Sequence, residues 1–170
     1  MSNHDLNSPD FSMLPSCGDF DFRIARDGTW FYRGSPIGRK SLVRLFSTVL
    51  RRENDGSYWL VTPVERGRIT VDDAPFVAVE MTVTGAGQDQ KLAFRTNVED
   101  WVTADADHPI RIDLAEGDQP SPYIRVRGAL DALISRPVFY QLVDLAETKG
   151  AELGVWSGGS YFPLGQVETA

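Results

Sequence analysis

Residues 32–36 read Tyr32-Arg33-Gly34-Ser35-Pro36, and this stretch decides the fold because a related pattern returns later in the chain. A helical pattern follows it, and Gly-Ser-Tyr-Trp at 56–59 then opens a short strand. Arg-Gly recurs at 127–128, Ser-Arg-Pro at 135–137 and Gly-Ser-Tyr-Phe at 159–162, at offsets of 94, 100 and 103 residues. The sequence therefore predicts two small tandem lobes, and a seam between lobes is a usual place for a ligand.

Each predicted lobe combines antiparallel strands with one helix. The first helix is expected to start at Ser35-Pro36, because Ser can cap a helix and Pro suits its first position. Its apolar residues fall at helical spacing over 42–50, and 54–56 ends it. The second helix is expected from 135–137 to Gly150. Alternating apolar residues or turn signals predict strands at 20–24, 30–33, 58–62, 68–71, 77–84, 92–94, 110–114, 123–127, 129–133, 153–156 and 161–164.

The resulting fold class is α+β, with no long linker between the lobes. We predict a mobile N-terminal arm over 1–18, an N-terminal lobe over 19–73 and a C-terminal lobe over 74–170. Residues 97–108 are acidic and irregular, with Trp101 and Val102 as their strong apolar anchors.

The bulk composition narrows the class of function. The chain has 170 residues and a net charge of −7, which argues against DNA or RNA as a partner, since phosphate neutralisation supplies most of that affinity. Apolar runs fall short of a membrane span. The start of the chain lacks the pattern of a signal peptide, and Cys17 is a single cysteine, so the expected location is the cytoplasm.

The charge is unevenly distributed along the chain. Residues 20–70 hold ten Lys or Arg against five Asp or Glu, whereas the remainder holds seven against nineteen. Either the basic part offers a cationic surface to an anionic ligand, or both parts are solvated faces of one stable protein.

The inventory of reactive side chains is small. His4 lies in the predicted arm, and His108 lies just before Pro109. With these two histidines, neither a Ser–His–Asp nor a Cys–His catalytic arrangement can be built. A zinc site, which needs four nitrogen or sulfur ligands, cannot be assembled either. Phosphate-binding glycine loops are absent, and we predict no cofactor. The remaining candidates for the acid and base of a hydrolase are Asp72, Asp73 and Glu65. Turn formation and exposure to solvent also explain why carboxylates occur at these positions.

A set of motifs resembles a known bacterial family. They are Asp27-Gly28-Thr29-Trp30, Gly34-Ser35-Pro36-Ile37, Asp55-Gly56-Ser57-Tyr58, residues 60–65 and 71–76, His108-Pro109, and the ending 153–159 with 162–165. The family is domain of unknown function 1285, and the resemblance covers nearly everything from residue 19 onward. It implies a duplicated α+β core whose second lobe is a partly open, pleckstrin-homology-like β-barrel with a packed helix. It further implies a ligand site between the lobes, for a nucleotide-like molecule, and a role in signalling.

These observations lead to a predicted inter-lobe site and to three hypotheses. The matched Arg-Gly pairs supply forked donors for phosphate or carboxylate, and nearby aromatic residues can stack on a planar ring or simply form core. The leading hypothesis is a non-enzymatic sensor or adaptor for a small anionic ligand. The second is a protein–protein interaction module, the third is the carboxylate hydrolase, and homodimerisation stays open. The predicted ligand-binding residues are Trp30, Arg33, Arg39, Thr62, Glu65, Arg125, Arg127, Trp156 and Ser157.

Overall fold

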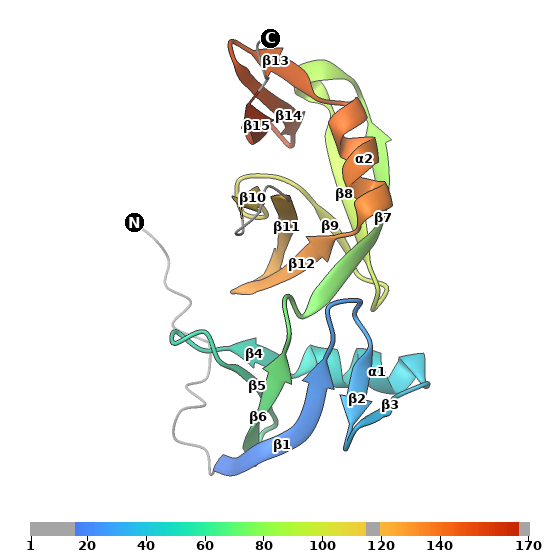
Figure 1. The fold of residues 1–170 in the computed structure, drawn as a ribbon, viewed down its shortest axis with the longest axis vertical. Coiled ribbons are helices and arrows are strands. Elements are labelled where there is room, and N and C mark those ends of the chain that lie inside the picture. Colours follow the sequence, from blue (N-terminus) through green and yellow to red (C-terminus); the bar gives the residue numbers. More distant parts are fainter. Residues whose placement is uncertain (1–15, 115–119, 167–170) are drawn as a thin grey trace.

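The computed structural model describes residues 16–114 and 120–166. Two six-stranded sheets lie one beyond the other along the long axis of the molecule, each with one helix nearby (Figure 1). The α+β fold of two lobes expected from the sequence is confirmed. None of the helices in the described ranges is long and apolar enough to cross a membrane.

The N-terminal lobe is one sheet with helix α1. Its elements are β1 (Ser16–Ile24), β2 (Trp30–Tyr32), β3 (Ser35–Pro36), α1 (Lys40–Thr48), β4 (Leu50–Arg52), β5 (Tyr58–Val61) and β6 (Arg66–Val71). The strand order is β3-β2-β1-β6-β5-β4, and the central pair, β1 and β6, is parallel. Alternating Phe20, Phe22 and Ile24 give β1 one apolar face, which α1 covers in part.

The C-terminal lobe repeats that strand order. Its first sheet contains β7 (Phe76–Thr84), β8 (Lys91–Thr96), β9 (Trp101–Thr103), β10 (Ile110–Leu114), β11 (Pro120–Arg127) and β12 (Leu130–Ile134). The order is β9-β8-β7-β12-β11-β10, again with a parallel central pair, β7 and β12. Each sheet is thus two three-stranded meanders joined through their first and last strands. The duplication is real, but β7 corresponds to β1, so the Arg-Gly turns matched in the sequence occupy different places in the repeat.

The rest of the C-terminal lobe follows this sheet. It consists of α2 (Arg136–Asp144), β13 (Glu147–Lys149), β14 (Glu152–Ser157) and β15 (Ser160–Gln166), with a 3₁₀ turn at Gly87–Asp89. Strands β13–β15 form a small antiparallel sheet, and β15 lies against β10, so the lobe curls into half of a barrel.

Several element boundaries differ from the prediction. Residues 16–18 are not arm but the start of β1, because Ser16 pairs with Arg66; the remainder of the predicted arm lies outside the described residues. The first helix does not begin at Ser35-Pro36. Arg33 and Gly34 have φ of 49° and 80°, and this left-handed turn folds the chain back so that Ser35 pairs with Tyr32.

Both helices are also shorter than expected, and three further strands besides β3 were not predicted. Helix α1 ends at Thr48, and Leu50 begins strand β4, which forms a hairpin with β5 around Gly56. Helix α2 ends at Asp144 rather than at Gly150, and β13 follows it. The stretch predicted to be irregular contains β9, where Val102 pairs with Phe94.

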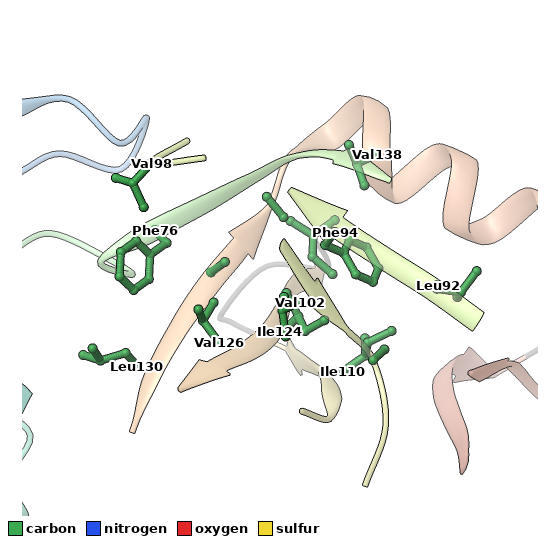
Figure 2. Close-up of a cluster of buried hydrophobic side chains, with 14 of the residues drawn as sticks. Phe76, Leu92, Phe94, Val98, Val102, Ile110, Ile124, Val126, Leu130 and Val138 are labelled. Atoms are coloured by element: carbon green, nitrogen blue, oxygen red, sulfur yellow. The ribbon is translucent and has the colours of Figure 1, made fainter. Parts of the chain in front are cut away.

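One hydrophobic core runs through both lobes. Ile24, Trp30 and Leu50 of the first lobe belong to the same buried cluster as Phe76 and Leu130 of the second. Figure 2 shows the C-terminal part of this cluster, where Phe76, Val98 and Leu130 lie nearest the first lobe. The lobes are therefore joined by apolar packing in the interior, which leaves only the rim of the seam for polar groups.

Candidate functional site

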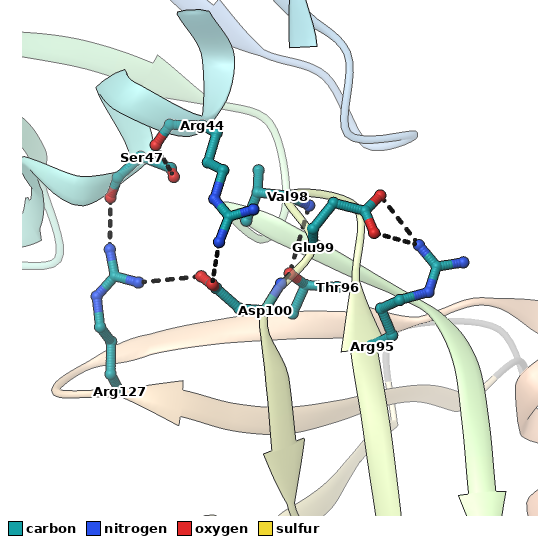
Figure 3. Close-up of polar contacts among 8 residues, drawn as sticks. All are labelled: Arg44, Ser47, Arg95, Thr96, Val98, Glu99, Asp100 and Arg127. Atoms are coloured by element: carbon teal, nitrogen blue, oxygen red, sulfur yellow. Dashed lines mark hydrogen bonds and ion pairs between the residues drawn. The ribbon is translucent and has the colours of Figure 1, made fainter. Parts of the chain in front are cut away.

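The polar rim of the seam is organised around Arg127, the last residue of β11. Its Nη2 donates a hydrogen bond to the main-chain oxygen of buried Ser47 in α1, and its Nη1 lies 3.8 Å from Asp100 Oδ2 (Figure 3). Its guanidinium carbon is 5.4 Å from the centre of the Phe76 ring. Arg127 therefore ties the second sheet to the end of α1, where carbonyl groups lack helical partners.

Asp100 stands between two arginines because the turn before β9 holds it there. Arg44 of α1 also approaches it, at 3.8 Å (Figure 3). Fully buried Thr96 organises the turn, since its Oγ1 accepts hydrogen bonds from the main-chain nitrogens of Val98 and Asp100. Glu99 completes the turn with φ of 69°.

A cleft of about 360 Å³ opens beside Arg127, between the two lobes. Arg51 and Arg52 of β4 line it from one side, and the Arg127–Leu130 turn lines it from the other. We call it the arginine cleft. Arg51 Nη1 donates to the main-chain oxygens of Thr48 and Leu50, at 3.3 and 2.7 Å, and Arg52 lies over the Tyr58 ring.

The arginine cleft is electrostatically positive. Burial lowers the pKa of Arg127, and the charge of Arg51 lowers it further, while Asp100 opposes the shift. Within the described ranges, no carboxylate forms an ion pair with Arg51 or Arg52. Arg51 and Arg52 therefore favour an anion beside Arg127, whose own ion-pair partner is Asp100, at 3.8 Å.

Arg125, by contrast, is already neutralised. Its Nε donates to Asp131 Oδ1 at 2.6 Å, and Arg111 Nη2 donates to Asp131 Oδ2 at 2.8 Å. Asp131 is buried, so two cationic partners satisfy a carboxylate that would otherwise be costly. Arg125 also donates to the main-chain oxygen of Gly128 at 3.1 Å and so supports the wall of the arginine cleft.

A second polar link joins the lobes at Asp73. Tyr123 of β11 donates its hydroxyl to Asp73 Oδ1 at 2.5 Å, and Arg26 lies 3.4 Å from Asp73 Oδ2. Asp72 is instead bound by Arg23, which lowers the pKa of the Asp72 carboxyl, and Glu65 lies at the Thr62 turn. Asp72, Asp73 and Glu65 thus each interact with different residues, which gives the hydrolase hypothesis no support.

The Tyr123–Asp73 bond predicts a change of stability at alkaline pH. Burial and the hydrogen bond to Asp73 raise the pKa of Tyr123 to about 12. The folded protein therefore holds this proton more tightly than the unfolded chain, whose tyrosine titrates near 10. The resulting stabilisation is complete below pH 10 and is lost as the pH rises towards 12. We expect Tyr123→Phe to lose less stability than the parent between pH 9.5 and 11.5, measured by urea unfolding; equal losses would contradict the assignment.

The structure distributes the predicted site residues over five places. Arg125 and Arg127 lie at the seam, whereas Arg33, Thr62 and Glu65 line a pocket within the N-terminal lobe. Trp30 is buried core, and Arg39 is exposed at the start of α1. Trp156 packs against Tyr161, and buried Ser157 links Leu92 to Ala104 through its hydroxyl.

Sequence reasoning missed Arg51 and Arg52. It placed them at the end of a helix, where they would be solvated, because it extended the helical pattern through Leu50. The signal that identifies them is the turn at Asp55-Gly56, where the main-chain nitrogen of Ser57 donates to Asp55 Oδ1. The predicted strand at 58–62 comes directly after this turn. A turn just before a strand indicates a hairpin, whose first strand would then lie at 50–52.

Comparison with known proteins defines the family. Residues 13–74 match the N-terminal domain model of DUF1285, a domain of unknown function, and residues 75–164 match the C-terminal domain model of the same family. The chain belongs to the DUF1285 family. A DUF1285 protein of Silicibacter pomeroyi DSS-3 has a solved structure with 52% identity and a TM-score of 0.87, over 91% of this chain and 84% of that one. The structure of a DUF1285 protein of Shewanella baltica OS155 has 25% identity and a TM-score of 0.56, over 73% and 91%. No curated protein matches the chain.

Proposed function

We propose that this DUF1285 protein is a non-enzymatic, cytoplasmic sensor or regulatory adaptor that binds a small anionic ligand in the arginine cleft. The observation that carries the proposal is the group of Arg51, Arg52 and Arg127 at one inter-lobe cleft. Guanidinium groups offer forked N–H donors whose geometry matches a phosphate or a carboxylate. A phosphorylated, nucleotide-like molecule is therefore the expected ligand class.

The location of the cleft supports a sensing role. Arg51 and Arg52 come from the N-terminal lobe, and Arg127 comes from the C-terminal lobe, so a bound anion interacts with both. Such a ligand stabilises whichever relative position of the lobes brings the three guanidinium groups closest. A second molecule then recognises the changed arrangement of the lobes at the seam.

The test is calorimetric titration of the full chain with inorganic phosphate, AMP, ADP, ATP and citrate. We expect at least one phosphorylated compound to bind more tightly than about 1 mM, which corresponds to about −4 kcal/mol. Replacing Arg51 and Arg52 by Gln should weaken this binding about tenfold or more, since each charge-assisted hydrogen bond contributes about 1.5–3 kcal/mol.

A matched control uses two exposed arginines outside the arginine cleft. Arg39→Gln with Arg68→Gln changes the net charge by the same amount and should leave the affinity unchanged. The proposal is wrong if no compound binds below 1 mM, or if the two double variants weaken binding equally, because attraction to net charge alone would then explain the result.

A further inference from the structure

The residues that line the arginine cleft restrict which part of a ligand it can recognise. Its volume of about 360 Å³ lies near the lower end of the range for ligand pockets, about 300–1,000 Å³. Among the described residues that line it, none carries an aromatic ring or a carboxylate. Its polar side chains are the three arginines and Thr48, whose hydroxyl donates to the main-chain oxygen of Leu45 at 2.6 Å. A planar base therefore finds neither a ring to stack on nor an amide or carboxylate to pair with its edge.

The charges around the arginine cleft are paired, apart from those of its own arginines. Asp100 lies 3.8 Å from both Arg44 and Arg127, so it compensates only one of the two (Figure 3). The neighbouring arginines and carboxylates pair with one another: Arg66 with Glu53, and Arg111 and Arg125 with Asp113 and Asp131. The cleft arginines and Arg44, set against Asp100, thus leave three positive charges for a ligand.

Other contacts hold the guanidinium groups of the arginine cleft in place before a ligand arrives. Arg51 uses Nη1 for two main-chain oxygens next to the end of α1, so its Nε and Nη2 remain available. Arg127 is anchored to α1 in the same way through Nη2. The guanidinium carbon of Arg52 lies 5.3 Å from the centre of the Tyr58 ring, and within the described ranges Arg52 makes no hydrogen bond. Because the side chains are already restricted, less conformational entropy is lost when an anion binds.

A diphosphate group matches these three charges better than a single phosphate does. A phosphate monoester carries about −1.5 to −2 at neutral pH, so it would leave one guanidinium group uncompensated. A second phosphoryl group adds about one further negative charge and more acceptor oxygens. Each of the three arginines can then bind oxygens of its own.

We propose that the arginine cleft recognises a diphosphate group, free or at the end of a larger molecule, and leaves the attached group in solvent. This inference rests on the proposed function and narrows its ligand class. Affinity then depends on the number of phosphoryl groups up to two, and it is insensitive to the base of a nucleotide.

The test is calorimetric titration of the full chain at neutral pH, at constant ionic strength and without magnesium. The ligands are phosphate, pyrophosphate, tripolyphosphate, adenosine, AMP and ADP. We expect pyrophosphate and ADP to bind within about threefold of each other, and each about tenfold or more tightly than phosphate or AMP. Tripolyphosphate should gain less than about threefold over pyrophosphate, since the three charges are already matched. Adenosine should not bind.

The possible results separate this inference from the proposed function. AMP as tight as pyrophosphate, or ADP more than about tenfold tighter than pyrophosphate, would overturn the inference and keep the proposed function, because the base would then be recognised. A further tenfold gain for tripolyphosphate would also overturn it, because affinity would then follow charge alone. If no phosphorylated compound binds more tightly than about 1 mM, the proposed function fails, and this inference fails with it.

A single-arginine variant tests the match of charges. Arg52→Gln replaces an exposed side chain that contacts the Tyr58 ring, so the fold should be kept. It should reduce the preference for pyrophosphate over phosphate from about tenfold or more to less than about threefold, since two positive charges remain. Arg39→Gln, which is exposed and lies outside the arginine cleft, should leave the preference unchanged. A preference that Arg52→Gln does not alter, or that both variants alter equally, would contradict the proposal.

Discussion

Replacing Trp30 by Ala is expected to destabilise the protein by about 3–5 kcal/mol, the usual cost of removing a large buried aromatic side chain. Trp30 is 1% exposed and lies on β2 opposite Ile24. Its ring centroid is 6.3 Å from that of Phe46 and 6.4 Å from that of Phe22. The substitution therefore empties the space between the first sheet and α1 and removes the packing support of Phe22 and Phe46.

The matched control for this change is Trp101→Ala in β9. Half of the Trp101 side chain, 51%, is exposed, so its removal should cost less than about 1 kcal/mol. Urea unfolding followed by far-ultraviolet circular dichroism measures both values. Similar losses in the two variants would mean that the N-terminal lobe is not packed around Trp30.

Trp30→Phe should be milder than Trp30→Ala, because Trp30 Nε1 is buried and makes no hydrogen bond with the described residues.

Replacing Gly28 by Ala is expected to cost about 2–4 kcal/mol, because it strains the main chain and disturbs the junction between the lobes. Gly28 has φ of +90°, and an added Cβ would lie 2.6 Å from Asn97 Nδ2. Asn97 Nδ2 donates to the main-chain oxygen of Gly28 at 3.3 Å, and its Oδ1 accepts from the main-chain nitrogen of Val77 at 3.0 Å. The clash therefore displaces the side chain that bridges the β1–β2 turn to the second sheet.

Gly34→Ala separates these two contributions. Gly34 has φ of +80°, but nothing lies within 4 Å of the position its Cβ would take. It should show the strain alone, about 1–2 kcal/mol. Urea unfolding gives the difference between the two variants, which measures the Asn97 link. If Gly34→Ala were as destabilising as Gly28→Ala, the junction would contribute nothing to stability.

The sequence was sufficient for the architecture because the main signals were local. Alternation of Phe20, Phe22 and Ile24 predicts β1, and the Ser-Arg-Pro start at 135–137 predicts α2. It was insufficient at Ser35-Pro36, which satisfies the rules for a helix start. The deciding feature there is the φ of Arg33, a non-glycine residue that adopts a left-handed conformation against its intrinsic preference.

The candidate site was harder to predict than the fold. Arg127 lies at the seam between the lobes, but its assumed counterpart, Arg33, lines a pocket within the N-terminal lobe. Local similarity of two Arg-Gly turns says nothing about which strands they join, and β2–β3 and β11–β12 occupy different positions in the repeated sheet. The arginines that share a cleft with Arg127 are Arg51 and Arg52 of β4, and that strand could be predicted only after its partner, β5, had been recognised.

The parallel pairing of first and last strands has a consequence for synthesis. A nascent chain has every strand of its N-terminal sheet once Val71 has left the ribosome, so that sheet can form while translation continues. Strand β7 is in the same situation within its own sheet as β1 is in the first, because its parallel neighbour β12 is the last strand of that sheet to be translated. Until then one edge of β7, with exposed Val79 and Val83 at its end, has no partner and can pair with another chain. Slow translation between β9 and β12 would therefore lengthen the period during which the protein is most prone to aggregate.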